Sequence, residues 1–303
     1  MHCNALTFPS TRHRLAIAWL VVVVGLLAAS PALVQTGTAG KTQMFDVGGL
    51  KLRALIDGQG REGQPTVVLV SAFGDGLEIW NPIQPAVAQF ARVVSYDRAG
   101  LGQSEAEDAP PTPQRVVTQL HTLLQNAGIK PPYVLVGHSI GGPYIRMFAG
   151  MYPSEVAGLV YVDPADFTQT RADQLAIWTE IGPGEAGMLA MEQAQSQQFE
   201  AASPAVRAEG QVLGQLMKSG WADFFSLPPV PDVPVVILMA AKVDMPPEMK
   251  AAFGKQRILH LAKWSADVSD GTFVMAGRSG HYIQQSEPDL IIWAIRRALK
   301  LDS

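Results

Sequence analysis

The stretch VLVGHSIGGPY, from Val134 to Tyr144, decides the fold. A short β-branched and apolar run predicts a buried strand, and it leads through Gly137 into a His–Ser pair followed by two more glycines. A sharp strand-to-helix turn leaves no room for side chains two positions before and two positions after the serine, which explains Gly137 and Gly141. The match to G-x-S-x-G in this context therefore predicts that Ser139 is a nucleophile exposed at the edge of a sheet.

Similar short runs recur on both sides of this stretch. Strands are predicted at residues 66–73, 91–97, 133–137, 158–163, 233–240 and 272–277, after a hairpin over residues 44–58. Helices are predicted after several of these strands, at residues 113–128, 140–152 and 288–301, where apolar residues recur at helical spacing. Strands that alternate with helices predict the α/β class, with a mostly parallel central sheet and helices on both faces.

Residues 166–230 interrupt this alternation, because they are rich in helix formers and carry no clear strand pattern. We expect a helical cap here, over the carboxyl edge of the sheet, where open α/β sheets bind ligands. The core would then comprise residues 44–165 and 231–303. The cap contains six large apolar residues that could line a flexible pocket: Met188, Met191, Met217, Trp178, Trp221 and Phe224. For most of them we favour the alternative, which is ordinary packing between helices.

A serine nucleophile needs a base, and His281 is the candidate. It lies in GRSGHYIQQSEP, a glycine-bearing loop between the last predicted strand and the last helix. Such a loop overhangs the carboxyl edge of the sheet, so an imidazole there can exchange a proton with the serine oxygen. His121 and His260 lie in predicted helices, and we expect His138 to pack beneath the turn.

The acid that orients the base has two candidates. Asp244 follows the predicted strand at residues 233–240 and fits the chain order serine, acid, histidine, so it is favoured. Asp163 ends the preceding strand and is the alternative, since a carboxylate at that position also reaches the same edge. Either residue would otherwise serve to order a loop or cap a helix.

Two main-chain amides are predicted to bind the oxyanion. One belongs to Phe73, in the stretch SAFGDG directly after the first central strand. The other belongs to Ile140, at a helix N-terminus where negative charge is favoured.

Composition excludes several classes of function. The chain has 303 residues, 48% of them hydrophobic, and a formal net charge of −4, which suits one large globular domain with or without an inserted subdomain. Nucleic-acid binding requires a basic patch, so we expect no nucleic-acid partner. Cys3 is the single cysteine, and no metal constellation or dinucleotide fingerprint occurs, so neither a metal nor another cofactor is expected.

Residues 1–34 carry a targeting pattern. An unbroken apolar run from Leu15 to Ala29 follows Arg12, His13 and Arg14 and precedes small residues, which predicts a secretory signal. With the residues up to 34 the run approaches the roughly 20 residues that span a bilayer, so an uncleaved membrane anchor is the alternative. Residues 35–43 would be a linker. Either interpretation places the folded part outside the cytoplasm, exported to the periplasm or medium, or anchored to a membrane.

Four stretches together resemble the α/β-hydrolase family, in its branch with a serine nucleophile. They are VVLVSAFGDGLEIW, YDRAGLGQSE, VLVGHSIGGPYIRMFAGMYPSEVAGLVYVDP and SGHYIQQSEPDLIIWAI, and the resemblance covers the chain from about Met44 onward. It implies roles for Ser139 and His281 and for the amides of Phe73 and Ile140.

Two departures from the family pattern matter. Ser71-Ala72 stands where most relatives have His-Gly. The segment AAKVDMPPE is a loose version of the usual glycine-and-aspartate signature, which keeps Asp163 open as the acid.

The predicted serine, base and acid lead us to expect hydrolysis of carboxylic esters through an acyl-enzyme. The large apolar residues of the cap suggest a small apolar ester or acyl compound as substrate. Acyl transfer, lactone or amide hydrolysis and carbon–carbon cleavage by the same residues are alternatives, and a non-catalytic small-molecule receptor is less favoured. A serine at this position argues against the dehalogenase and epoxide-hydrolase branches, which use aspartate.

Overall fold

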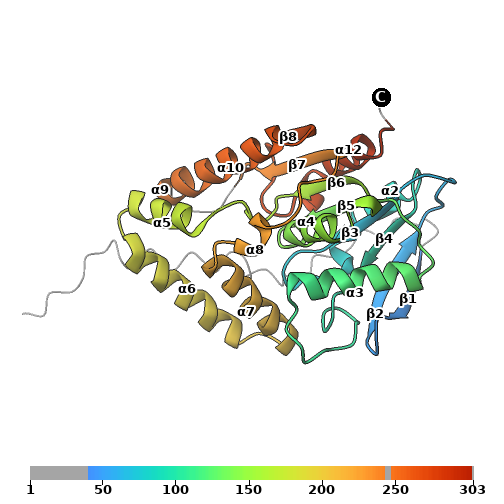
Figure 1. Cartoon of the computed structure of the whole chain (residues 1–303), viewed down its shortest axis with the longest axis horizontal. Helices are drawn as coiled ribbons and strands as arrows, with labels where there is room; N and C mark the ends of the chain where they lie inside the picture. Colours follow the sequence, from blue (N-terminus) through green and yellow to red (C-terminus); the bar gives the residue numbers. More distant parts are fainter. Residues whose placement is uncertain (1–39, 243–246, 302–303) are drawn as a thin grey trace, which may run out of the picture.

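The computed structural model describes residues 40–242 and 247–301 (Figure 1). The predicted signal or anchor at residues 1–34 and the favoured acid Asp244 therefore lie outside the described residues. The first strand, β1, begins at Lys41, so it takes up the end of the predicted linker. Within the described ranges, no helix is both long enough and apolar enough to cross a membrane.

An eight-stranded sheet forms the centre of the molecule, in the order β1-β2-β4-β3-β5-β6-β7-β8. The pairs β1–β2 and β2–β4 are antiparallel, and all the other neighbouring pairs are parallel. This topology confirms the α/β class and the hairpin predicted at the N-terminal side. The strands are β1 (Lys41–Asp46), β2 (Lys51–Asp57), β3 (Thr66–Val70), β4 (Val93–Tyr96), β5 (Tyr133–His138), β6 (Val156–Val162), β7 (Pro234–Ala240) and β8 (Asp270–Ala276).

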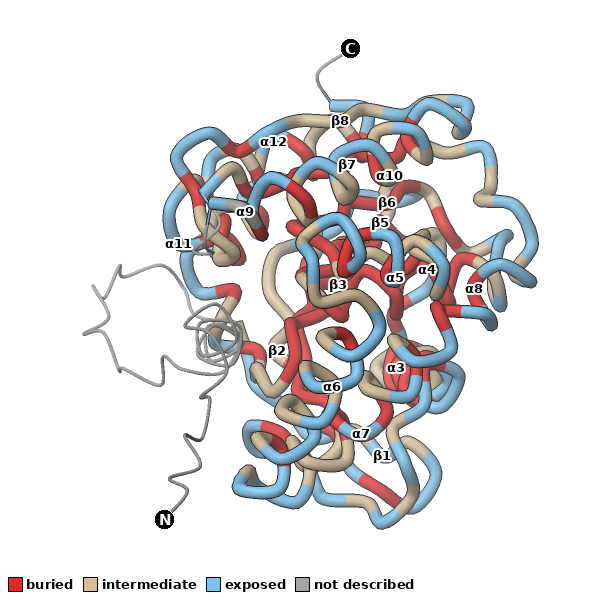
Figure 2. Tube along the Cα trace, turned by 90° about the vertical axis from the view of Figure 1, so that its left-hand side faces the viewer, coloured by how far each residue is buried: buried red, intermediate tan, exposed pale blue. Residues whose placement is uncertain are grey.

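Helices cover both faces of the sheet because alternate residues of its central strands are apolar on both sides. Val68 and Val70 of β3 pack in one hydrophobic cluster, whereas Val67 and Leu69 pack in the other. The first cluster includes residues of α3 (Pro113–Asn126), α4 (Gly141–Met151) and α10 (Lys255–Ala266). The second includes residues of α2 (Gln84–Val87), α11 (Ile283–Ser286) and α12 (Pro288–Ala298). In Figure 2 the buried segments are concentrated in the middle of the molecule.

Four helices lie between β6 and β7 and are called the cap below. They are α5 (Arg171–Glu180), α6 (Gly184–Glu200), α7 (Pro204–Lys218) and α8 (Ala222–Phe225), and Figure 1 shows them grouped to the left of the sheet. They fall inside residues 166–230, where helices without strands were predicted; the division into two domains stays a prediction. All six large apolar cap residues named above pack in hydrophobic clusters, as favoured from the sequence.

Shorter elements complete the connections. Single turns occur at η2 (Leu77–Trp80) and η3 (Pro153–Glu155), and α9 (Pro247–Met249) continues through the π-helical η4 (Lys250–Gly254) into α10. Helix α3 begins at Pro113, where a helix was predicted to begin. Thr112 caps it by accepting a 3.3 Å hydrogen bond from the Arg115 amide.

Candidate active site

Ser139 lies in a strained turn between β5 and α4. Its φ is +54°, a left-handed conformation that serine rarely adopts. A Cβ at Gly137 would lie 2.3 Å from the carbonyl oxygen of Gly141, and one at Gly141 would lie 2.4 Å from that of Val70. Both contacts are far too short, so the glycines are required by the tightness of the turn, as the sequence pattern predicts.

His281 lies beside this turn, in the loop between β8 and α11. The centroids of its ring and the His138 ring are 4.7 Å apart, and His138 directly precedes Ser139 in the chain. The Nδ1 atom of His281 lies 2.6 Å from Oδ2 of Asp163, and an ionised carboxylate can only accept this hydrogen bond. The tautomer with the proton on Nδ1 is thereby fixed, which leaves Nε2 as the proton acceptor.

Asp163 stands at the end of β6 with a φ of +41°. Its Oδ1 accepts a 2.9 Å hydrogen bond from the Ala240 amide and lies 3.0 Å from Nη2 of Arg257. Burial raises the pKa of Asp163, but the Arg257 charge and the hydrogen bond from His281 outweigh it, so this pKa lies well below its ordinary value. The carboxylate is therefore a permanent negative charge beside the imidazole.

The acid in contact with His281 is thus the one that the sequence ranked second. Asp163 and Asp244 follow neighbouring parallel strands, β6 and β7, whose carboxyl ends meet at one edge of the sheet. Chain order alone does not separate two such positions. The structure brings Asp163 to the imidazole and leaves Asp244 outside the described residues.

His138 is fully buried and contacts His281, as expected for a residue that packs beneath the turn. Its Nε2 lies 2.8 Å from the carbonyl oxygen of His281, and its Nδ1 lies 3.2 Å from Nε2 of Gln284. These partners require a neutral ring that donates from Nε2 and accepts at Nδ1. Burial accordingly lowers the pKa of His138 to about 3.

The other described histidines are engaged elsewhere. His121 contacts the Glu155 carboxylate at 3.0 Å and stacks on Tyr152, next to a cavity of about 260 Å³ at the amino end of β5. His260 contacts the Asp166 carboxylate at 3.2 Å, and this hydrogen bond raises the pKa of the imidazole.

The two predicted oxyanion donors face no competing acceptor. Phe73 lies in the loop after β3, and Ile140 precedes the first turn of α4. Within the described ranges, neither main-chain N–H donates a hydrogen bond to a protein group. The segments that carry them lie against each other: a Cβ at Gly141, the residue after Ile140, would lie 3.1 Å from the carbonyl oxygen of Ser71.

A buried ion pair, which the sequence reasoning missed, holds residues 71–76, called the oxyanion loop below. Arg98 follows β4 and Glu209 lies in the middle of α7; their Nε and Oε1 atoms are 2.6 Å apart, and Nη2 and Oε2 are 3.1 Å apart. The side chains are only 3% and 2% exposed. Arg98 also donates to the carbonyls of Ser71 at 2.8 Å and Ala72 at 2.6 Å, while Glu209 accepts from the Gly74 amide at 2.7 Å.

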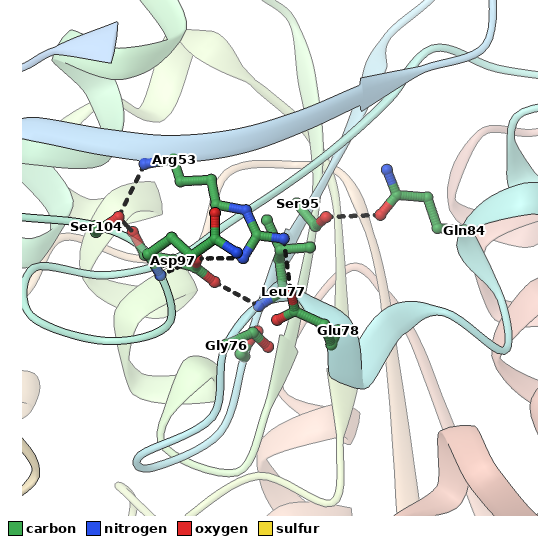
Figure 3. Close-up of polar contacts among 10 residues, drawn as sticks. Arg53, Gly76, Leu77, Glu78, Gln84, Ser95, Asp97 and Ser104 are labelled. Carbon is green, nitrogen blue, oxygen red and sulfur yellow. Dashed lines mark hydrogen bonds and ion pairs between the residues drawn. The ribbon is translucent and has the colours of Figure 1, made fainter. Parts of the chain in front are cut away.

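Asp97, the neighbour of Arg98, anchors the far end of the oxyanion loop (Figure 3). Its fully buried carboxylate accepts hydrogen bonds from the Leu77 amide at 2.7 Å and from Nη1 of Arg53 at 3.1 Å. Gly76 and Gly102 pack so closely that a Cβ at either would lie within 3 Å of this carboxylate. The oxyanion loop is therefore fixed at both ends by charged groups.

Asp75 is a second carboxyl group close to the candidate base. Burial raises the pKa of Asp75, although the charges of Arg98 and His281 oppose this effect. Its neighbour Tyr282 is also partly buried, and burial raises the pKa of that phenol to about 12. Among the described residues, no group donates a hydrogen bond to the buried Oδ2 of Asp75.

No metal site accompanies these groups in the described part of the chain: no group of three or more His, Cys, Asp or Glu side chains there is placed to hold an ion. The arrangement consists of a hydroxyl on a strained turn, an imidazole oriented by a carboxylate, and two unengaged amides. These are the parts that acyl transfer through a serine nucleophile requires.

Comparison with known proteins identifies the family. The profile of the Alpha/beta hydrolase family matches residues 67–292, a span that contains every residue of this arrangement. The chain belongs to the alpha/beta hydrolase family. It is accordingly an enzyme, and one of its curated relatives is named as a lipase.

Solved structures of this α/β-hydrolase fold share little sequence with the chain. A 2-hydroxy-6-oxo-6-phenylhexa-2,4-dienoate hydrolase from Rhodococcus sp. strain RHA1 superposes with a TM-score of 0.60 at 19% identity, covering 86% of this chain and 99% of that one. A putative epoxide hydrolase from Pseudomonas aeruginosa gives a TM-score of 0.60 at 17% identity, covering 89% and 100%. These likenesses establish the fold.

Curated relatives match shorter segments at higher identity. The uncharacterized protein YqjL of Bacillus subtilis is 34% identical over 100 residues, which cover 33% of this chain and 40% of YqjL. A (lyso)-N-acylphosphatidylethanolamine lipase of Bos taurus is 31% identical over 111 residues, covering 35% of this chain and 32% of the lipase. The match thus spans less than half of either relative.

Proposed function

We propose that this α/β-hydrolase cleaves carboxylic esters through an acyl-enzyme formed on Ser139. The observation that carries the proposal is the 2.6 Å contact between His281 Nδ1 and Asp163 Oδ2, beside the glycine-bounded turn that holds the serine. A contact of this kind orients an imidazole as a general base and stabilises it once it has accepted a proton.

The reaction would proceed in two halves. Ser139 Oγ attacks the acyl carbon while His281 Nε2 takes its proton, and the N–H groups of Phe73 and Ile140 stabilise the oxyanion. The tetrahedral intermediate collapses, and the leaving alkoxide receives that proton from His281. Water then gives a proton to His281 and attacks the acyl carbon, and the second collapse returns the proton to Oγ and releases the acid.

Apolar groups around the oxyanion loop support an apolar acyl group as the substrate's main feature. The rings of Phe73 and the cap residue Phe199 lie 5.0 Å apart, and a methyl group of Val206 in α7 lies 3.6 Å from the Cβ position of Gly74. The bovine relative's name also refers to an acyl lipid.

Fluorophosphonate labelling and an ester panel test this proposal. We expect the wild-type enzyme to be labelled and to hydrolyse 4-nitrophenyl esters of short acids, whereas Ser139→Ala is not labelled and loses about 10⁴-fold or more in kcat. Ser226→Ala, which removes an exposed hydroxyl directly after α8, is the control and keeps its activity. Full ester hydrolysis by Ser139→Ala would refute the proposal.

Related reactions are separated by their products. Acyl transfer would yield a new ester when an alcohol is added, and lactones, amides and carbon–carbon substrates belong on the same panel. A fluorophosphonate-inert wild-type protein that binds such compounds without turnover would instead be a receptor.

We also propose that the enzyme acts outside the cytoplasm, on the strength of the apolar run from Leu15 to Ala29. Expression of the full chain, followed by fractionation and intact mass measurement, distinguishes a cleaved exported form from an anchored one. Full-length protein in the cytoplasmic fraction would contradict both.

A further inference from the structure

One of the main-chain groups that the Arg98–Glu209 pair contacts in the oxyanion loop is the peptide group between Ala72 and Phe73. Nη2 of Arg98 donates a 2.6 Å hydrogen bond to the carbonyl of Ala72, and the N–H on the other side of that peptide bond belongs to Phe73. Because a trans peptide is planar, its C=O and N–H point in opposite directions. Fixing the Ala72 carbonyl therefore fixes the direction of the Phe73 N–H, the proposed oxyanion donor.

We propose that Arg98 and Glu209 are positioning residues that orient and polarise the Phe73 amide, and that the cap thereby completes the oxyanion hole. This inference rests on the proposed function, since it requires an oxyanion to form at Ser139. A charged donor on the carbonyl strengthens the N–H of the same peptide as a donor, because hydrogen bonds in series polarise one another.

Glu209 makes this arrangement depend on the cap. The residue lies in α7, and it holds Arg98 through two contacts while also accepting from the Gly74 amide at 2.7 Å. The first turn of α7 packs on the same loops, with Ala205 against Gly100 and Val206 against Gly74. A displacement of α7 would therefore release Arg98 and the oxyanion loop together.

Glu209→Asp is the first test, because it keeps the charge of the buried pair but shortens the side chain by one methylene. Aspartate cannot reach both Arg98 and the Gly74 amide. We expect kcat for a 4-nitrophenyl ester to fall by about 10- to 100-fold, less than the 10²- to 10³-fold cost of removing an oxyanion donor outright. We expect KM to stay within about threefold, because the oxyanion exists only in the transition state.

A tetrahedral analogue gives a second readout that a purely structural role would not move. The inhibition constant of an alkylboronic acid, which binds the serine as a tetrahedral adduct, should rise in parallel with the fall in kcat. Glu192→Asp is the matched control, since it shortens another cap carboxylate that pairs with an arginine, Arg171, away from the oxyanion loop. This control keeps kcat and the inhibition constant within about twofold.

The double variant Arg98→Met/Glu209→Leu covers the case in which Glu209→Asp fails to fold. Replacing a buried ion pair by apolar side chains of similar volume often preserves stability. We expect this variant to show a cooperative thermal transition together with the reduced kcat. A folded Glu209→Asp or double variant with wild-type kcat, or with only a raised KM, overturns the inference. Failure of the proposed function would be recognised separately. The wild-type enzyme would then not hydrolyse the ester, or Ser139→Ala would keep full activity.

Discussion

His281 Nδ1 and Asp163 Oδ2 lie 2.6 Å apart, although 118 residues separate them in the chain. The histidine follows β8 and the aspartate ends β6, so the contact reaches across the end of β7, which pairs with both strands. The left-handed φ of Asp163 turns the chain sharply at this point. The contact thus depends on sheet order and on a local backbone bend together.

The acid is tested by Asp163→Asn and Asp244→Asn in parallel. Loss of the carboxylate at the acid position removes both the tautomer control and the charge that stabilises the imidazolium. We expect Asp163→Asn to lower kcat by about 10⁴-fold and Asp244→Asn to change it by a few-fold at most. Steady-state kinetics on one ester decides the matter, and the reverse ranking would assign the acid to Asp244.

Arg257 is expected to tune the pH dependence of the reaction. Its charge lowers the pKa of Asp163, so Arg257→Gln should raise that pKa toward its ordinary value and leave the carboxylate charge less neutralised. A less neutralised carboxylate stabilises the imidazolium more strongly, so the acidic limb of the kcat/KM profile should move to higher pH. Lys255→Gln removes an exposed charge from the same helix and should leave the acidic limb of the kcat/KM profile where it is. Coincident profiles for Arg257→Gln and wild type would contradict this role.

The turn at Ser139 is expected to tolerate no added methyl group. Gly141→Ala would place a Cβ 2.4 Å from the Val70 carbonyl, so we expect it to lower the free energy of unfolding by about 1–3 kcal/mol. Gly214→Ala, in the middle of α7 with open space at its Cβ position, should raise the same quantity by about 0.5–1 kcal/mol. Denaturant titration measures both free energies of unfolding. If Gly141→Ala changed this free energy as Gly214→Ala does, the close contact with the Val70 carbonyl would be absent.

His138 should make stability fall as the pH is lowered. Its pKa is lowered to about 3 in the folded protein, against an ordinary value of about 6.5 in the unfolded chain. Between these values the unfolded state binds a proton that the folded state does not, so the free energy of unfolding decreases with falling pH by up to about 1.4 kcal/mol per unit. The dependence between pH 7 and 5 should be shallower in His138→Gln. Identical slopes would mean that His138 titrates in the folded protein.

The central strands and the turn at Ser139 could be predicted because their signals are local. A run of five β-branched and apolar residues, such as Thr66–Val70, has few alternatives to a buried strand, and Gly137 reflects a contact within a few residues, with Gly141. His281 was identified because it lies in a glycine-bearing loop at the correct end of the last strand.

The supporting ion pairs could not be predicted, because their partners are distant in the chain. Arg98 and Glu209 are 111 residues apart, and Glu209 lies in a helix whose sequence resembles an exposed amphipathic segment. The choice between Asp163 and Asp244 likewise depends on which strand end faces the imidazole, a property of the folded sheet. In both cases three-dimensional proximity decides, and no spacing in the sequence encodes it.

The buried Arg98–Glu209 contact also constrains how this enzyme can be re-engineered. A chimera that replaced residues 171–225 with the lid of another hydrolase would leave a guanidinium enclosed without its counterion, unless the incoming helix supplied a carboxylate at the equivalent place. Lid exchange aimed at new substrates should therefore carry Glu209 over, or change Arg98 at the same time.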